Sequence, residues 1–262
     1  NEYLGRSLSQ FGRFTYQYAN KYIAQAVVRR DGSDKFGPRN RYGVFPSVSF
    51  AWKLSEEEFI KKIPVISFLK LRGGYGINGN DHIDQYQYLS LMSPGQYYPY
   101  GTYNNITNVQ GIIRSRNMAN PYIQWERSKQ FDMGIELGLF KNALFINIEP
   151  YQKSSDKMLF SLPLTLSSGY ADFQSNPSQV INAGLITNRG LDFSVTYKGN
   201  VGSLAYSVGG NISTFKYTVD KLADNNPILR SGVLASGENV SRTIVGQSSG
   251  YFYGYHCDGI FQ

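Results

Sequence analysis

The stretch Gln130-Phe131-Asp132-Met133-Gly134-Ile135-Glu136-Leu137-Gly138-Leu139 decides the fold class. Its odd-numbered positions are all apolar, whereas its even-numbered positions are polar or glycine. Successive side chains of a β-strand point to opposite faces, so this period of two predicts a strand with one apolar and one polar face.

The same alternation recurs on both sides of this stretch. Lys141-Asn142 reads as a tight turn into a second strand near 144–149, and residues 199–202 join two further alternating segments at 191–198 and 204–213. Other strands are expected at 11–18, 22–30, 47–54 and 69–75. The pattern predicts a chain of antiparallel hairpins with about eight to ten strands.

The connections between these strands alternate in length. Short ones are expected at 19–21, 55–64, 141–142 and 199–202, and long ones at 31–41, 77–121, 154–184 and 217–250. Within 55–64, Ser55 with Glu58 predicts a capping box that opens a single helical turn. Short turns at one end and long loops at the other are typical of outer-membrane β-barrels.

Composition leaves two all-β classes open. No stretch approaches the roughly 18 to 20 apolar residues of a membrane helix, whereas barrel strands alternate and need no such run. The 21 Tyr and 27 Gly among 262 residues also fit an extracellular β-sandwich, such as a surface adhesin or a carbohydrate-binding domain. That sandwich is the alternative, but it gives no reason for loops to be sorted by end.

Charge and cysteine content exclude other classes. The net charge of +7 is spread along the chain without a basic helix or an RNA-binding motif, so nucleic-acid binding is not expected. The single Cys257 excludes an internal disulfide framework and a cysteine-based zinc site. No cofactor is predicted.

The two faces of the strands predict two environments. Apolar positions are expected to contact lipid; they are Phe131, Ile135, Leu137, Leu191, Phe193, Val195 and Tyr206. Polar positions are expected to face a wet lumen; they are Asp132, Glu136, Asn147, Glu149, Asp192 and Asn211. Arginine should therefore be costly at Ile135 or Val195 and better tolerated at Gly134 or Ser194.

The strand count predicts a transmembrane antiparallel β-barrel of which this chain forms only a part. Barrels with ionisable interiors and large outer loops usually have more strands, and open strand edges do not survive in lipid.

Several motifs along the chain resemble those of the SusC/RagA family of TonB-dependent transporters. The first group comprises Arg30-Asp31-Gly32-Ser33, Phe36-Gly37, Arg41-Tyr42-Gly43, Phe45-Pro46-Ser47-Val48-Ser49, Trp52 and Ser55-Glu56-Glu57. The second comprises Leu69-Lys70-Leu71-Arg72, Gly74-Tyr75-Gly76, Gly79-Asn80, Trp125-Glu126, Gly134, Gly138 and Leu139-Phe140. The third comprises Asn188-Arg189-Gly190-Leu191-Asp192-Phe193, Phe252-Tyr253-Gly254-Tyr255 and Asp258-Gly259-Ile260-Phe261-Gln262. Their order and spacing carry the resemblance, although residues 77–121 and His256-Cys257 depart from the family pattern.

The resemblance implies an outer-membrane protein with a 22-stranded barrel around an amino-terminal plug. It implies import of oligosaccharides or peptides, energised by TonB through the amino-terminal region and assisted by a SusD-like surface lipoprotein lid. Residues 1–262 would then be a partial barrel domain, with the plug and the last strands absent. A transporter of this kind is not an enzyme, and no catalytic residues are expected.

A tyrosine-rich segment in the loop 77–121 is the candidate binding site. Tyr97, Tyr98, Tyr100 and Tyr103 could stack on sugars or contact the lid, or they could serve loop packing or an interfacial aromatic girdle. Asp81-His82-Ile83-Asp84 is too weak a pattern to predict a metal site.

Overall fold

Eight long strands form one antiparallel sheet in the computed structural model of the chain, which describes residues 5–102, 105–114, 117–168, 178–222, 228–233, 239–254 and 259. The eight strands are β1 (Ser7–Tyr18), β2 (Tyr22–Ser33), β3 (Tyr42–Lys53), β4 (Ile66–Asn80), β8 (Glu126–Leu139), β9 (Leu144–Asp156), β12 (Leu185–Val201) and β13 (Leu204–Lys221). The predicted all-β antiparallel fold is confirmed. The large sheet has eight of the predicted eight to ten strands, and the described long connections add further short strands that alternation did not predict.

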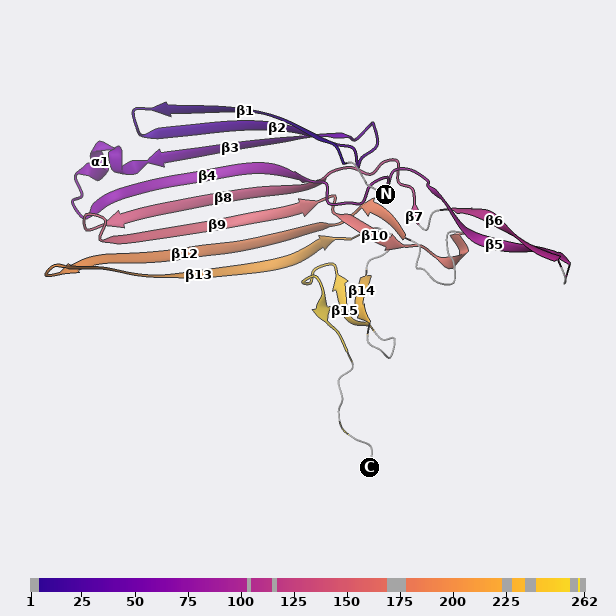
Figure 1. The fold of residues 1–262 in the computed structure, drawn as a ribbon. Helices are drawn as coiled ribbons and strands as arrows, with labels where there is room; N and C mark the ends of the chain where they lie inside the picture. Colours follow the sequence, from indigo (N-terminus) through magenta and orange to yellow (C-terminus); the bar gives the residue numbers. More distant parts are fainter. Residues whose placement is uncertain are drawn as a thin grey trace.

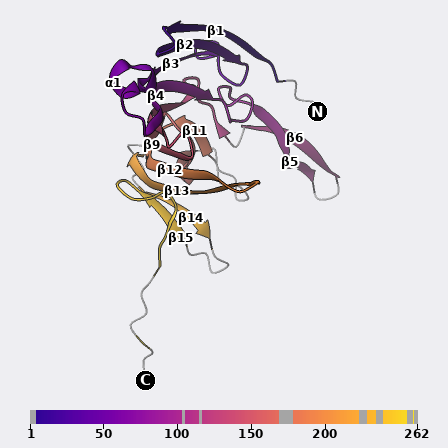
Figure 2. The same ribbon diagram turned by 90° about the vertical axis from the view of Figure 1, so that its left-hand side faces the viewer.

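The sheet follows the chain order without crossovers. Its order is β1-β2-β3-β4-β8-β9-β12-β13, so each long strand pairs with the next long strand along the chain. Viewed from the end of the sheet in Figure 2, the strands succeed one another from β1 at the top to β13 below as a curved wall. The wall is not closed, since β1 and β13 are its two edges.

Short connections gather at one end of the sheet, at the left in Figure 1. In the link between β1 and β2, Ala19 and Asn20 adopt φ values of 49° and 56°, the positive values of a type I′ hairpin turn. The link between β3 and β4 contains a 3₁₀ turn, η1 (Leu54–Glu56), and the single-turn helix α1 (Glu58–Lys61). In the described part of the chain, no helix has both the length and the apolarity that crossing a membrane requires.

The predicted capping box in this link is wrong. The residue that caps α1 is Glu57, and neither η1 nor α1 has a side-chain capping hydrogen bond. The carboxylate of Glu57 instead accepts hydrogen bonds from Lys21 and Tyr22 at 2.9 Å and from Trp52 at 3.1 Å. Charge-assisted bonds from neighbouring strands replace local capping.

Long connections gather at the opposite end of the sheet and carry strands of their own (Figure 1). β5 (Met92–Thr102) and β6 (Asn105–Arg114) form a hairpin that projects away from the sheet. A second small sheet contains β7 (Asn117–Met118), β10 (Leu159–Pro163) and β11 (Ser178–Asn182), and η2 (Leu166–Ser168) follows β10. The third contains β14 (Ile228–Val233), β15 (Asn239–Ile244) and β16 (Tyr251–Phe252).

The buried apolar side chains of the described residues lie at this long-connection end, away from the middle of the sheet. One cluster contains Phe36, Phe45, Ile123 and Trp125, with the Trp125 ring centroid 5.0 Å from that of Phe36. A second contains Ile186, Val219 and Leu222. The long connections are therefore packed onto the strand ends.

Candidate functional site

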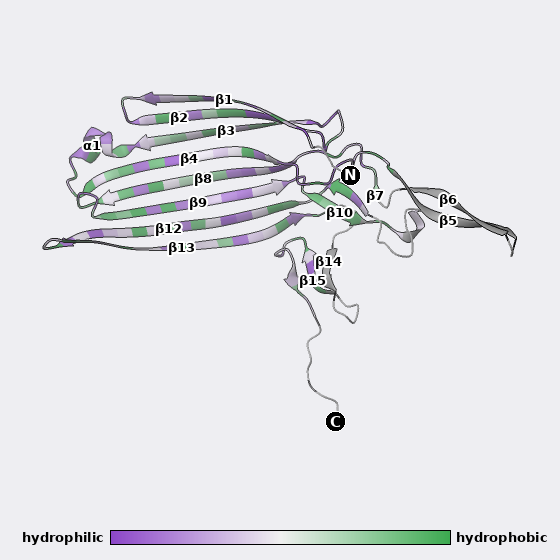
Figure 3. Cartoon of the chain, viewed as in Figure 1, coloured by the Kyte–Doolittle hydropathy of each residue, from purple (hydrophilic) through white to green (hydrophobic). Residues whose placement is uncertain are grey.

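A single register row shows that the sheet has one apolar face. From β1 to β13, the directly paired residues are Tyr18, Tyr22, Trp52, Leu71, Ile135, Ile148, Phe193 and Ile212. Figure 3 shows the resulting alternation of hydrophobic and hydrophilic residues along the strands. Directly paired residues project from the same face, so the row crosses all eight strands on one side, here called the apolar face.

The apolar face is uncovered. On the interior strands of the sheet, Ile135 is 43% exposed, Phe50 is 50% exposed, and Met133 is 53% exposed. No second sheet packs over these side chains among the residues that the structure describes. A β-sandwich would bury such a face between two sheets, whereas a membrane barrel presents it to lipid.

The six residues predicted to face the lumen share the opposite side, the polar face. Glu136 pairs with Asn147, Asn147 pairs with Ser194, and Ser194 pairs with Asn211. Glu149 pairs with Asp192, and Asp132 stands four residues before Glu136 on β8. That this face lines a lumen stays a prediction.

Four charged side chains form a cluster at the centre of the polar face. Lys70 and Arg72 of β4 contact Glu136 of β8 at 3.1 and 3.0 Å. Arg72 also extends to Glu149 of β9, where two nitrogens meet two oxygens at 3.2 and 2.5 Å. The cluster joins three strands and leaves two positive and two negative charges balanced. Sequence alternation predicted the two carboxylates but not their partners, because pairing depends on strand register.

Aromatic rings mark the short-turn end of the apolar face. Tyr22 stacks on Tyr18 and Trp52, with ring centroids 6.5 and 5.9 Å apart, respectively. Rings of this kind gather where barrel strands leave the hydrocarbon region. Glu57, in the β3–β4 link, accepts hydrogen bonds from Tyr22 and Trp52 of this aromatic row. The hydrogen bond from Lys21 is the largest cause that lowers the pKa of the Glu57 carboxyl, and those from Trp52 and Tyr22 follow. The hydrogen bond to Glu57 raises the pKa of Lys21.

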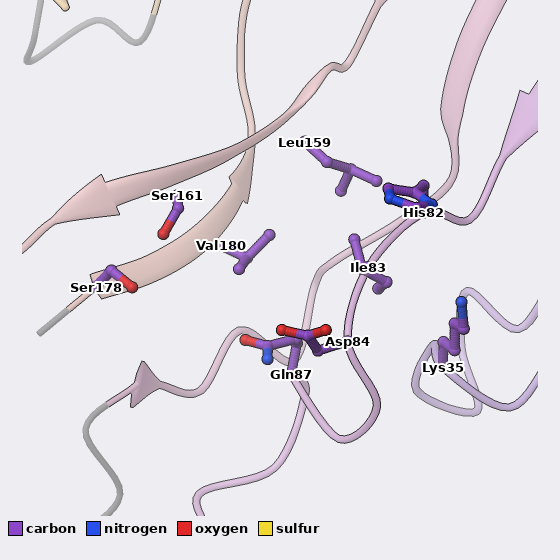
Figure 4. Close-up of a pocket in the computed structure, with 9 residues that line it drawn as sticks. All are labelled: Lys35, His82, Ile83, Asp84, Gln87, Leu159, Ser161, Ser178 and Val180. Carbon is purple, nitrogen blue, oxygen red and sulfur yellow. The ribbon is translucent and has the colours of Figure 1, made fainter. Parts of the chain in front are cut away.

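A cavity of about 490 Å³ lies among the long connections. It is lined by Lys35, His82, Ile83, Asp84, Gln87, Leu159, Ser161, Ser178 and Val180, which come from three separate connections (Figure 4). We call it the loop cavity.

Its walls combine charge with an unused acceptor. Lys35 and Asp84 bring opposite charges to the lining, and Lys35 donates to the carbonyl oxygen of Asp81. Gln87 is 9% exposed, and its buried Oε1 has no hydrogen-bond partner. That oxygen is buried beneath the lining, so Lys35 and Asp84 are the groups that suit the loop cavity to a ligand with polar groups.

Hydrogen bonds hold the cavity walls in place. Asn120 donates to the carbonyl oxygen of Val180, and Gln179 donates to that of Ala119. Asn182 likewise donates to the carbonyl oxygens of Gln124 and Lys157. Two connections far apart in the sequence are thereby tied together.

Of the four candidate tyrosines, the structure describes only the backbone of three. The backbone of β5 contains Tyr97, Tyr98 and Tyr100, but their side chains and all of Tyr103 lie outside the described residues. Their role in binding stays a prediction.

The residues of the weak metal pattern at 81–84 do not lie around one point. His82 and Asp84 line the loop cavity, whereas Asp81 contacts Lys35 through its carbonyl oxygen. The described residues contain no group of three or more His, Cys, Asp or Glu side chains arranged to hold a metal ion.

Comparisons with known proteins match the fold over nearly the whole chain. Residues 2–251 match the family model described as "TonB dependent receptor-like, beta-barrel". TonB-dependent receptor P39 of Formosa agariphila is 32% identical over 255 residues, which cover 97% of this chain and 22% of that protein. TonB-dependent receptor SusC of Bacteroides thetaiotaomicron is 30% identical over 260 residues, covering 95% of this chain and 25% of that protein.

A solved structure shares the arrangement of the strands. The RagAB peptide importer in its "open-open" state superposes with a TM-score of 0.78 at 25% identity, covering 95% of this chain and 25% of that chain. The chain thus spans about a quarter of the length of these relatives.

Proposed function

The chain belongs to the TonB-dependent receptor-like β-barrel family, and from this premise we propose that its parent protein actively imports oligosaccharides or peptides. Barrels of this family lie in the outer membrane, so the location predicted from the alternating strands is confirmed. The β-sandwich alternative is not favoured, because the match covers residues 2–251 and the apolar face is uncovered.

The observation that carries the proposal is the register row that gives the sheet two unlike faces over all eight strands. An apolar outer surface fits lipid, and a wall of carboxylates, amides and cations fits a passage for polar solutes. Among the relatives, one named receptor is SusC and one solved structure is a peptide importer. Both resemblances support import by the parent protein, which we place outside the enzymes.

The partners we propose follow from the two ends of the sheet. Residues 1–262 form part of a larger barrel whose amino-terminal plug and remaining strands are supplied elsewhere in the parent, with TonB acting through the amino-terminal region. The long connections form an outer platform for a SusD-like lipoprotein lid. Connections of this length usually have a function of their own.

Substrate contact is proposed at the same end. The loop cavity offers the opposite charges of Lys35 and Asp84. Tyr98 and Tyr100 on the β5–β6 hairpin would add apolar ring surfaces with polar tips. The polar face of the sheet, including Asp132 and Asp192, would line the route below.

Uptake by cells tests the import proposal. Cells producing the full-length protein and its lid should accumulate labelled oligosaccharides or labelled peptides, and deletion of TonB or a protonophore should abolish the accumulation. Accumulation of one probe class alone would assign the substrate. Uptake that persists without TonB, or failure of both classes, would contradict the proposal.

Trimming the loops tests the lid. Removing the β5–β6 hairpin should weaken co-purification of the lid while the barrel stays inserted. Removing the paired tip of the β12–β13 hairpin around Gly202, at the opposite end of the sheet, is the control and should leave the lid bound. A lid that co-purifies fully after each long connection is trimmed in turn would exclude the platform.

A further inference from the structure

Gly73 is the centre of a three-by-three grid of apolar-face residues. Its row contains Phe50 of β3 and Met133 of β8, the row nearer the short turns contains Trp52, Leu71 and Ile135, and the third row contains Val48, Tyr75 and Phe131. The other eight positions all carry large side chains. The grid therefore encloses a groove of about 460 Å³ whose floor is Gly73.

The groove walls are complete within the chain. β3, β4 and β8 are interior strands, each hydrogen-bonded to a neighbour on both sides. Phe50, Phe131 and Met133 are about half exposed, so they rise around the groove and leave it open to the surroundings.

Local geometry does not require a glycine at position 73. Its φ is not positive, the pairing of β4 runs past it without a bulge on either side, and an added Cβ would meet only the Asp132 carbonyl oxygen at 3.6 Å. Gly74 and Gly76 differ, since a Cβ at either would crowd Asp132 or Ser47 at 3.2 Å. A glycine inside a strand lowers stability, and without a bulge or a bend it often marks the close approach of a ligand.

The position of the groove identifies the leaflet that it faces. Trp52 belongs to the aromatic row at the short-turn end, and Gly73 lies two residues beyond the row of Trp52, or about 7 Å along the strand. The hydrocarbon core is about 30 Å thick, so Gly73 lies within the leaflet on the short-turn side. Short turns of outer-membrane barrels are periplasmic, and that leaflet is built of phospholipids.

We propose that the Gly73 groove is a binding site for one acyl chain of a periplasmic-leaflet phospholipid. The groove is continuous with the surface that meets lipid. Its lining is mostly apolar or aromatic, and it also includes Ser49 and Arg72, whose positions alternate to the polar face. An acyl chain would bury apolar surface of Phe50, Tyr75 and Met133 without needing a polar partner. The missing side chain at position 73 creates the depth that distinguishes this site from the rest of the apolar face.

Photo-crosslinking of the full-length transporter tests the site. The protein is reconstituted in vesicles of phosphatidylethanolamine that contain a diazirine in one acyl chain, irradiated and mapped by mass spectrometry. Adducts should be severalfold more frequent on Phe50, Tyr75 and Met133 than on Leu191 and Phe193, which lie on the same face away from the groove. Gly73→Leu should remove the excess, whereas Val195→Leu, on the apolar face of the interior strand β12 away from the groove, should preserve it.

The map of lipid adducts on the wild-type protein tests the proposal without any variant. Equal labelling along the apolar face would overturn the proposal, as would an excess that survives Gly73→Leu. Labelling by a glycolipid probe but not by the phospholipid probe would also overturn it, as would protein–protein cross-links in place of lipid adducts. If Gly73→Leu fails to insert, Gly73→Ala should still lower the excess, because its Cβ has room at 3.6 Å and makes the groove shallower.

Discussion

Arg72 of β4 reaches Glu149 of β9 across the full width of β8. Its Nη1 and Nη2 lie 3.2 and 2.5 Å from the two carboxylate oxygens, while its Nε lies 3.0 Å from Glu136 of the strand between them. The side chain passes over Gly134, where a Cβ would be 2.8 Å from the Arg72 Nε. One guanidinium thereby joins three strands on the polar face.

The first prediction concerns the energy of this bridge. Arg72→Met should lower the free energy of unfolding by about 1–2 kcal/mol, because it leaves the partly exposed Glu149 without its cation and Glu136 with Lys70 alone. Glu149→Gln should cost less, since Glu136 still neutralises the arginine. A double-mutant cycle in a vesicle refolding assay measures the coupling. Strictly additive losses would show that the observed contacts contribute nothing.

The second prediction concerns the glycine beneath the bridge. Gly134→Ala should displace Arg72 and lose a similar stability, about 1 kcal/mol, despite the higher strand preference of alanine. Gly73→Ala is the control on an interior strand, since an added Cβ there would meet only the Asp132 carbonyl oxygen at 3.6 Å, and it should be neutral or slightly stabilising. In the Arg72→Met background, Gly134→Ala should also become neutral. A loss that persists there would point to the backbone instead of the arginine.

Alternation in the sequence predicts which residues share a face of the sheet, because successive side chains of a strand point to opposite sides. It also predicts which ends carry the short turns, since hairpin connections read directly from the spacing. It does not predict that Arg72 covers Gly134, because that contact depends on the register between β4 and β8. This contact adds a steric cost to arginine at Gly134 that alternation does not show, and the better tolerance of arginine at Gly134 and Ser194 than at Ile135 and Val195 stays a prediction.

The same limit applies to the candidate site. Glu57 lies between the two residues predicted to form a capping box, but its donors Lys21, Tyr22 and Trp52 are 36, 35 and 5 residues away along the chain. The loop cavity likewise combines Lys35, Gln87 and Val180 from three connections, and no local sequence pattern predicts such a cavity. Contacts made between connections are set by packing at the strand ends, which alternation does not encode.

The third prediction compares the two faces. Ile135→Arg places a charge on the apolar face, in the register row of Trp52 toward the short-turn end, and should cost about 1–2 kcal/mol, between the values for the bilayer midplane and the interface. Ser194→Arg places the same side chain on the polar face, beside Asn147 and Asn211, and should be nearly neutral. Refolding into vesicles measures both changes. Equal losses at the two positions would contradict the assignment of one face to lipid and the other to water.

The fourth prediction concerns pH at the short-turn end. Hydrogen bonds from Lys21, Trp52 and Tyr22 hold the pKa of the Glu57 carboxyl below its ordinary value of 4.5. A lowered folded-state pKa contributes stability that is present above the unfolded-state value and lost as pH falls through the folded-state value. The pKa of Lys21 is raised, so its contribution is present below its unfolded-state value of 10.5 and lost as pH rises through the folded-state value. The contact should therefore be intact over the neutral range and weaken at both extremes.

Trp52 reports this contact directly, because its indole nitrogen donates to Glu57. Its fluorescence should change as pH falls below 4.5, and Trp52→Phe should remove the change while the buried Trp125 remains as an unaffected signal. Glu57→Gln should also abolish the transition, because a neutral amide has no proton to gain. Glu58→Gln, one residue along in α1, is the matched control and should preserve it. A transition that survives Glu57→Gln would mean that another group titrates beside Trp52 and that the Glu57 contact does not control this end of the wall.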